Sequence, residues 1–371
     1  MKQIIKYMVN VWDYLEEYEI EKDEILSAIE SVLGSGKLIL GPNVMAFEKE
    51  FSQWCGSSHG VGVGNGTDAI FLALKALKLS PGDEVITVAN TAVPTVSAIT
   101  AAGGVPVFID VDPNTYLMDV DLIEAKITPR TKGVIAVHLF GQCVNMLKLK
   151  DVCEKFKLWI IEDCAQSHGA MFLGQKAGTM SDISTFSFYP TKILGTYGDG
   201  GLCMTNSIEH FESLKKLRFY GMEKTYYSIE QGYNSRLDEL HAAILRKKLE
   251  KLDIYIHKRK VLASKYDQEL KNSIYKTPTV ANGNSHAYYL YVLQHNDRDR
   301  IIEDLKKKGI IVNISYPWPI HTMYGFEYLG YKNGDLPVTE SLARRIFSIP
   351  MYPSLSENSQ NFIIETLLDI Q

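Results

Sequence analysis

The segment from Gly60 to Met204 alternates short apolar runs with stretches of helical spacing, and this order constrains the fold more than any other feature. Short apolar runs are typical of strands buried on both faces of a sheet. Strands that alternate with helices favour a mostly parallel sheet with helices on both faces. We therefore predict an α/β fold, with strands at residues 85–89, 105–111, 133–140, 158–161, 183–188 and 201–204.

Helical spacing also flanks this segment. Residues 19–33 and 44–55 form two predicted helices before it, and a charged helical segment at 235–256 follows it. Beyond that, a helical stretch at 298–308 lies between strand-like runs at 288–293 and 309–314. We predict a large domain at residues 1–256 and a smaller C-terminal α+β domain at 257–371.

Composition excludes several classes of function. The formal net charge is −5 and the pI is near 6.0, so nothing indicates a nucleic-acid partner. Because no apolar run approaches about eighteen residues, we expect no membrane segment. The five cysteines are scattered and lack metal-ligand spacing, which favours buried reduced thiols in a cytoplasmic protein and predicts no metal.

Lys192 and Asp163 form the most informative pair of side chains. Most lysines are solvated, but Lys192 lies between an alternating run at 184–188 and a glycine-rich turn at 198–201. Asp163 follows an apolar strand, and α/β sheets bind ligands at the carboxyl ends of their strands. Pyridoxal phosphate needs this pair, because a lysine forms a Schiff base with its aldehyde and a carboxylate keeps its pyridine nitrogen protonated.

A glycine-rich stretch at residues 63–69 ends one apolar run and opens a helix. The backbone N–H groups of Gly66 and Thr67 would then face an anion at the helix N-terminus. Ser187, five residues before Lys192, could add a hydroxyl to the same phosphate. Two simpler interpretations stay open: a plain turn capped by Thr67 or Asp68, and a polar residue on a strand.

Several longer motifs make a resemblance specific. Together they resemble the DegT-type nucleotide-sugar aminotransferases, from about residue 20 to the C-terminus. The motifs are residues 41–42, 64–69, 81–85, 106–112, 162–169, 187–192 with 198–201, 232–236, 328–340 and 349–353.

The resemblance implies a fold type I pyridoxal phosphate enzyme, a homodimer whose active sites lie at the subunit interface. Lys192 would form the Schiff base, Asp163 would pair with the pyridine nitrogen, and Gln166 would lie near the ring hydroxyl. The remaining cofactor contacts that the resemblance implies are Ala165 on one ring face, and Gly66, Thr67, Ser187 and the other subunit's Asn234 at the phosphate.

Two of these positions carry open questions. Asn234 could instead cap a helix that starts near Ser235. Ala92 stands where the family usually has an aromatic residue that stacks on the second ring face, and alanine cannot stack.

The implied reaction moves an amino group from L-glutamate to a keto-sugar carried on a nucleotide, with Lys192 as general base. Tyr189 and the aromatic segment at 316–324 are the sugar-side candidates, although that segment could equally pack on the large domain. Arg236 would bind glutamate's carboxylate or pair with an acidic neighbour. The other candidates are Tyr316, His321 and Tyr324 for the sugar, and Arg218 and Tyr220 for the pyrophosphate.

The residues 89–94 and 316–324 look closest to enzymes that convert a dTDP-3-oxo-6-deoxyhexose into a dTDP-3-amino-3,6-dideoxyhexose. Alternatives are a 4-aminotransferase acting on a dTDP- or UDP-4-oxo sugar and a regulatory relative without turnover. The presence of Lys192, Asp163, Gln166 and Ser187 together argues against the regulatory relative. Lys192 also disfavours sugar dehydration, since relatives that dehydrate have histidine there.

Overall fold

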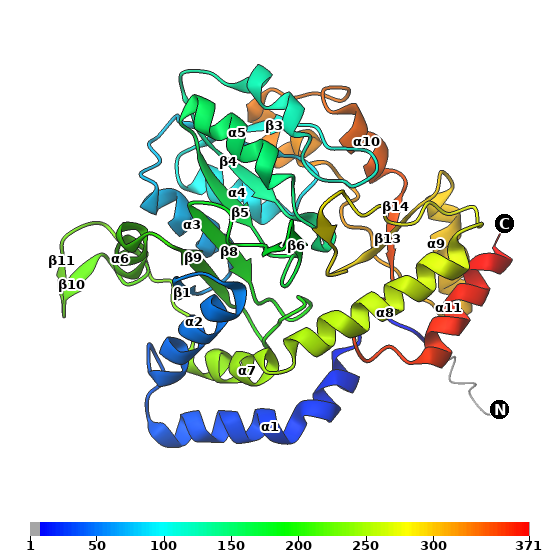
Figure 1. Ribbon diagram of the computed structural model, residues 1–371, viewed down its shortest axis with the longest axis horizontal. Helices are drawn as coiled ribbons and strands as arrows, with labels where there is room; N and C mark the ends of the chain where they lie inside the picture. The colour runs from blue at the N-terminus through cyan, green and yellow to red at the C-terminus, as the bar shows by residue number, and fades with distance from the viewer. Residues whose placement is uncertain (1–7, 371) are drawn as a thin grey trace.

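A seven-stranded sheet lies at the centre of the computed structural model, which describes residues 8–370 (Figure 1). Strand β9 runs antiparallel to both of its neighbours, and every other pair of neighbouring strands in this sheet is parallel. The prediction of a mostly parallel sheet is therefore confirmed. In order across the sheet, the strands are β1 (His59–Val63), β9 (Gly201–Thr205), β8 (Ile183–Ser187), β5 (Trp159–Asp163), β4 (Thr131–Val137), β2 (Glu84–Val88) and β3 (Val105–Ile109).

The predicted strands at 133–140 and 105–111 are each too long at the carboxyl end. Strand β4 stops at Val137 because Leu139–Gly141 turn out of the sheet, with Phe140 at φ 59°. Strand β3 stops at Ile109, and Val111 pairs instead with Met118. Periodicity alone does not mark such ends, since the apolar pattern continues into the turn.

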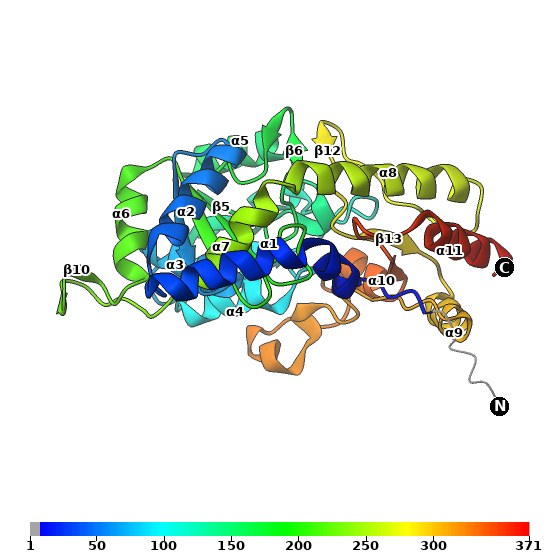
Figure 2. The same ribbon diagram turned by 90° about the horizontal axis from the view of Figure 1, so that it is seen from below.

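Helices cover both faces of this sheet, as predicted; in Figure 2, α5 lies on one side and α4 on the other. Helix α3 starts at a capped turn, where the Asn65 side chain accepts a hydrogen bond from the Asp68 N–H. The helices here are α1 (Tyr14–Ser35), α2 (Pro42–Cys55), α3 (Gly66–Ala76), α4 (Val93–Ala101), α5 (Met146–Phe156), α6 (Ile208–Leu217) and α7 (Glu239–Leu249).

The predicted helix at 235–256 is wrong in its bounds. Helix α7 starts only at Glu239, and a break before Leu252 separates it from α8 (Leu252–Leu270). Helix α8 runs unbroken past residue 256 into the C-terminal part of the chain (Figure 1). The division of the chain at residue 256 stays a prediction.

A second apolar core lies in the C-terminal part, around Tyr266, Tyr291, Leu305 and Phe347. Residues 309–314 do not form the predicted strand; they make single bridges from Ile310 to Val9 and from Asn313 to Ser348. The elements here are β13 (Tyr291–Gln294), β14 (Ile346–Ile349), α9 (Arg298–Lys308), α10 (Pro337–Ala343) and α11 (Glu357–Asp369).

Residues 315–340 return from this part to the large sheet. Ile320 and Leu336 pack against Ala89, Val96 and Phe108, so an aromatic segment covers the sheet edge where the strands end. Two small sheets complete the chain: β6 (Met171–Phe172), β7 (Gln175–Lys176) and β12 (Asn284–Ser285), and the hairpin of β10 (Met222–Lys224) and β11 (Tyr227–Ser228).

The β10–β11 hairpin extends away from the body of the molecule in both views (Figures 1 and 2). Its tip residue Tyr226 is 92% exposed, and Tyr227 and Ile229 are exposed as well. Across residues 8–370, every helix is too short or too polar to cross a membrane.

Candidate active site

A cavity of about 540 Å³ opens at the carboxyl ends of β4, β5 and β8, the edge where α/β sheets bind ligands. Strand direction explains the convergence, because parallel strands bring their last residues to one edge. The cavity brings together these residues that the sequence singled out: Gly66, Thr67, Ala92, Asp163, Ala165, Gln166, Ser187, Tyr189 and Lys192.

Asp163 is the last residue of β5, and its carboxylate is held in a fixed orientation beside the cavity. The side chain is only 5% exposed. One carboxylate oxygen accepts a hydrogen bond from Thr95 Oγ1 at 2.8 Å, and the other accepts from the Ala165 N–H at 3.1 Å. Thr95 in turn contacts Thr91 Oγ1 at 3.1 Å. Sequence reasoning missed both threonines, whose one signal is their spacing of four residues across the start of α4.

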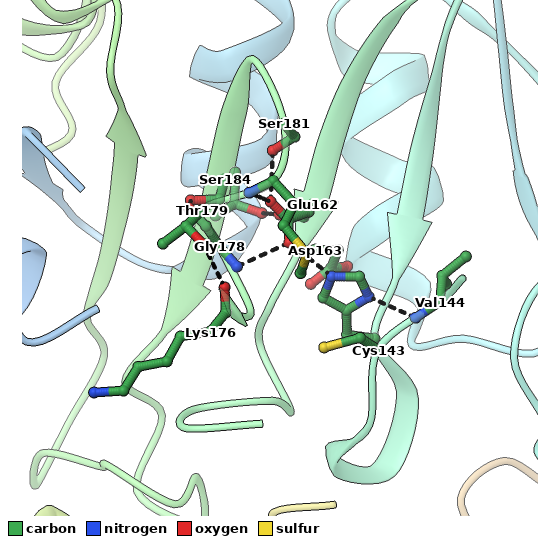
Figure 3. A network of polar contacts seen from close by, with 12 residues as sticks. Cys143, Val144, Glu162, Asp163, Lys176, Gly178, Thr179, Ser181 and Ser184 are labelled. Atoms are coloured by element: carbon green, nitrogen blue, oxygen red, sulfur yellow. Dashed lines mark hydrogen bonds and ion pairs between the residues drawn. The ribbon is translucent and has the colours of Figure 1, made fainter. Parts of the chain in front are cut away.

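Glu162, the neighbour of Asp163, anchors β5 from within the protein (Figure 3). Its carboxylate accepts hydrogen bonds from His138 Nε2 at 2.9 Å and from the N–H groups of Gly178 and Met180 at 2.8 Å each. Burial opposes ionisation here, but these hydrogen bonds hold the pKa of Glu162 below its ordinary value. The charged side chain therefore ties the strand that carries Asp163 to two other segments.

His138, Glu162 and Cys164 lie close enough together to suggest a metal site. However, His138 Nδ1 accepts a hydrogen bond from the Val144 N–H at 3.1 Å, which leaves the ring proton on Nε2, facing Glu162. The ligand atoms of His138 and Glu162 are thus already hydrogen-bonded to protein groups. The cluster serves to brace β5.

The glycine-rich turn before α3 forms a tight cradle against β8. A Cβ atom at Gly66 would lie 2.7 Å from Ser187 Cβ, so a side chain there would displace the turn. The first N–H groups of a helix lack partners within the helix and bind anions. With the Ser187 hydroxyl beside them, they form a site that fits a phosphate monoester.

Lys192 lines the same cavity as the turn and lies in the loop after β8. Its Nζ is 4.7 Å from the centre of the Tyr289 ring, and the Tyr289 hydroxyl lies 3.2 Å from Thr191 Oγ1. A cation over an aromatic face is stabilised by the ring quadrupole. Sequence reasoning missed Tyr289, because it falls in a predicted strand and carries no local signal.

Gln166 links the cavity to the covering aromatic segment. Its Oε1 accepts from the Phe140 N–H at 2.8 Å, so its Nε2 is the donor to the Tyr316 hydroxyl at 2.8 Å. Burial raises the pKa of Tyr316, and the neighbouring Tyr289 and Asp163 raise it further. Tyr316 both packs on the large core and presents a neutral hydroxyl next to a cavity residue.

Three of the four sugar-side candidates, Tyr316, His321 and Tyr324, are not among the residues that line this cavity within the described part of the chain. His321 is buried and contacts Glu340 at 3.0 Å, while Tyr324 is 91% exposed. Both line a separate hollow of about 370 Å³. Tyr189 lines the main cavity and is 52% exposed, so its ring is available at the rim.

The candidates for pyrophosphate and carboxylate binding also lie elsewhere. The Arg218 guanidinium is buried, where it donates to the Gly62 carbonyl at 2.8 Å and to Glu48. Arg236 lies over the rings of Phe219 and Tyr220, with centroid distances of 5.3 and 5.7 Å. None of these three candidates lines the cavity within the part of the chain that the structure describes.

Asn234 is exposed and pairs with Phe219 at the base of the hairpin. The alternative that Asn234 caps a helix is wrong, because α7 begins at Glu239 with Asp238 at the cap position. Among residues 8–370, no hydrogen-bond partner holds the Asn234 side chain.

The sequence profile of the DegT/DnrJ/EryC1/StrS aminotransferase family matches residues 19–368. The chain belongs to this family. It is 51% identical to the dTDP-3-amino-3,4,6-trideoxy-alpha-D-glucose transaminase of Micromonospora megalomicea subsp. nigra, over 97% of this chain and 98% of that protein. The dTDP-3-amino-3,6-dideoxy-alpha-D-galactopyranose transaminase of Aneurinibacillus thermoaerophilus is 40% identical, over 93% and 94%.

The crystal structure of S. venezuelae DesV with a ketimine intermediate superimposes with a TM-score of 0.96 at 36% identity, covering 98% of both chains. The family, the fold type I architecture and the pyridoxal phosphate-dependent aminotransferase activity are therefore confirmed. The residues present fit this cofactor: a glycine cradle for the phosphate, a held carboxylate for the ring nitrogen, and a lysine in the lining of the same cavity.

His168 allows a prediction about stability. It is fully buried against Phe51, Phe186 and Phe188. Burial, with a further contribution from the charge of Lys192, lowers its pKa from 6.5 to about 3. Between pH 6.5 and about 3 the unfolded chain binds a proton that the folded chain does not, so stability falls as the pH falls, by up to about 1.4 kcal/mol per pH unit.

His168→Phe removes this titrating group and keeps an aromatic ring. We expect the thermal unfolding temperature of the variant to fall less between pH 7 and pH 5 than that of the wild type. Both proteins keep His286, whose pKa burial also lowers to about 3, so its contribution to the pH dependence is the same in both. Equal losses for the variant and the wild type would contradict the assignment.

Proposed function

We propose that this enzyme transfers an amino group from L-glutamate to carbon 3 of a nucleotide-linked keto-sugar. In the proposed reaction, a dTDP-3-oxo-6-deoxyhexose is converted into a dTDP-3-amino-3,6-dideoxyhexose. The observation that carries it is the placement of Lys192 and Asp163 at one cavity, in a chain whose two relatives above are both named for dTDP-3-amino sugars. The more similar relative is named for a 3,4,6-trideoxy sugar, which makes a 4-deoxy substrate the second candidate.

The cofactor, when bound, acts as an electron sink for the carbon that exchanges its proton. Gly66, Thr67 and Ser187 would hold its phosphate, and Asp163, fixed by Thr95, would keep its ring nitrogen protonated. Lys192 would carry the cofactor in the resting enzyme and then move the proton at the reacting carbon. The Tyr289 ring beside Nζ stabilises the protonated amine while the lysine is free.

On the sugar side, Tyr189 and Tyr316 are the hydroxyl groups best placed for a substrate. Tyr189 stands exposed at the rim, and Tyr316 is held by Gln166. Both are neutral donors that suit sugar hydroxyl and carbonyl oxygens. Ala92 lines the cavity with a small side chain, which leaves more room at that position than an aromatic residue would.

The test is an assay with L-glutamate as donor and three acceptors: a dTDP-3-oxo-6-deoxyhexose, its 4-deoxy analogue, and a dTDP-4-oxo-6-deoxyhexose. We expect 2-oxoglutarate and the amino sugar to form with one of the 3-oxo sugars at a much higher kcat/KM than with the 4-oxo sugar. Preference for the 4-oxo sugar would overturn amination at carbon 3. If the protein binds the cofactor but glutamate fails to aminate it in every mixture, the result would favour a regulatory relative without turnover.

We further propose that the working unit is a homodimer with shared active sites. The arm, which we define as residues 219–234 with the β10–β11 hairpin, extends away from the body of the molecule (Figure 1). Asn234 is its last residue and lies at its base, and it is the residue that the family resemblance places in the partner's phosphate site. Helix α1 also exposes Leu15, Leu26 and Leu33. Leu15 and Leu26 line one apolar hollow, and contiguous exposed apolar surface of this kind marks protein interfaces.

Complementation tests the shared site. Homodimers of Lys192→Ala chains are expected to be inactive, and homodimers of Asn234→Ala chains to be weakly active because they bind the cofactor less well. Mixed under conditions of subunit exchange, they form heterodimers in which one site carries both defects and the other carries neither. Activity should rise toward that of one intact site per heterodimer. Exchange without recovered activity, or a fully active monomer, would exclude Asn234 from the partner's site.

A further inference from the structure

Ser235 joins the phosphate-binding turn to the base of the arm. It is only 4% exposed. Its Oγ accepts a hydrogen bond from the Gly64 N–H at 3.0 Å and donates to Asp68 Oδ2 at 2.6 Å. Gly64 and Asp68 flank Gly66 on its two sides, so a single hydroxyl closes the turn at both ends.

The same residue is fixed on the arm side. The Ser235 N–H donates to the Arg218 carbonyl at 3.0 Å, and the Arg218 guanidinium is bound to the Gly62 carbonyl and to Glu48. Asn234, the next residue, pairs with Phe219. Residues on both sides of the arm are therefore attached to β1 and to the turn that follows it, and this gives the buried Arg218 a structural role.

We propose that Ser235 is a positioning residue that couples the two cofactor sites of the dimer, so that they bind pyridoxal phosphate with positive cooperativity. The inference rests on the shared-site dimer proposed above. A phosphate that orders the turn also orders Ser235, through Gly64 and Asp68. Ser235 adjoins Asn234, which belongs to the partner's site. The arm is therefore already ordered when the partner's site binds its own cofactor, so the second binding event loses less conformational entropy.

The experiment titrates the cofactor-free, full-length dimer with pyridoxal phosphate and counts dimers with none, one and two cofactors by native mass spectrometry. For the wild type we expect more doubly loaded dimers than independent sites would give. Ser235→Ala should weaken cofactor binding by about tenfold, within the usual range for coupled sites, and should make loading statistical. Ser235→Thr keeps the hydroxyl and should retain cooperative loading.

Ser57→Ala is the matched control. Ser57 is also buried, and its hydroxyl also donates a hydrogen bond, to the Thr205 carbonyl at 3.3 Å. It lies before β1, whereas the phosphate-binding turn follows β1. This variant should load like the wild type. If Ser235→Ala does not fold, Asp68→Asn replaces it, because that change removes the charged acceptor and keeps the side-chain size.

The outcomes separate this inference from the proposed function. Statistical loading of a wild-type dimer, or cooperative loading retained in Ser235→Ala or in its substitute Asp68→Asn, would overturn the coupling and leave the proposed activity intact. A wild type that is monomeric would overturn both the shared site and the coupling.

Discussion

Lys192→Ala is expected to abolish amino transfer while the protein still binds pyridoxal phosphate. Loss of general acid–base catalysis alone lowers rates by about 10²- to 10⁴-fold, and the variant also loses its covalent attachment to the cofactor. Binding should persist because the phosphate and ring contacts come from other residues, among them Gly66, Ser187 and Asp163. Turnover with glutamate, the absorption band of lysine-bound cofactor and the bound phosphate content measure the three effects.

Lys155→Ala is the matched control for this variant. Lys155 is an exposed lysine that pairs with Glu124 at 2.9 Å, on a helix away from the cavity. Exposed ion pairs contribute little to stability, so its activity and its absorption band should match those of the wild type. Full activity of Lys192→Ala would show that another lysine binds the cofactor.

The parts of the fold that depend on local sequence were predictable. Apolar runs located every strand of the central sheet from β2 to β9, and the position of Asp163 after such a run placed it at the cavity. The glycine turn was predictable from local sequence as well, because position 66 lies too close to Ser187 for any residue with a Cβ atom. Strand and helix ends were less predictable: the break between α7 and α8 interrupts a continuous helical pattern.

Contacts between distant segments were not predictable. Thr95 reaches Asp163 across 68 residues, and Gln166 reaches Tyr316 across 150. Arg218 shows the same limit: guanidinium geometry suits phosphate, but the sequence does not show that the Arg218 side chain binds Glu48, 170 residues away. Tertiary structure decides which partner a polar side chain finds, and no spacing in the sequence records that choice.

Asp163→Asn is expected to lower the rate of amino transfer by two or more orders of magnitude, each tenfold loss being ~1.4 kcal/mol of transition-state stabilisation. Asparagine has nearly the same size and its Oδ1 can still accept the hydrogen bond from Thr95. It carries no charge, however, and so cannot hold the cofactor's ring nitrogen protonated. Single-turnover rates with glutamate, on protein of known cofactor content, measure the loss.

Thr95→Val separates the charge of Asp163 from its orientation. The valine variant keeps the carboxylate and removes the 2.8 Å hydrogen bond that holds it; a hydrogen bond of this kind contributes about 0.5–1.5 kcal/mol, so a loss of roughly tenfold or less is expected. If charge is decisive, Asp163→Asn must be far slower than Thr95→Val. Equal losses would mean that the orientation of the side chain matters more than its charge, and near-wild-type turnover of Asp163→Asn with cofactor bound would mean that the ring nitrogen is protonated by another group.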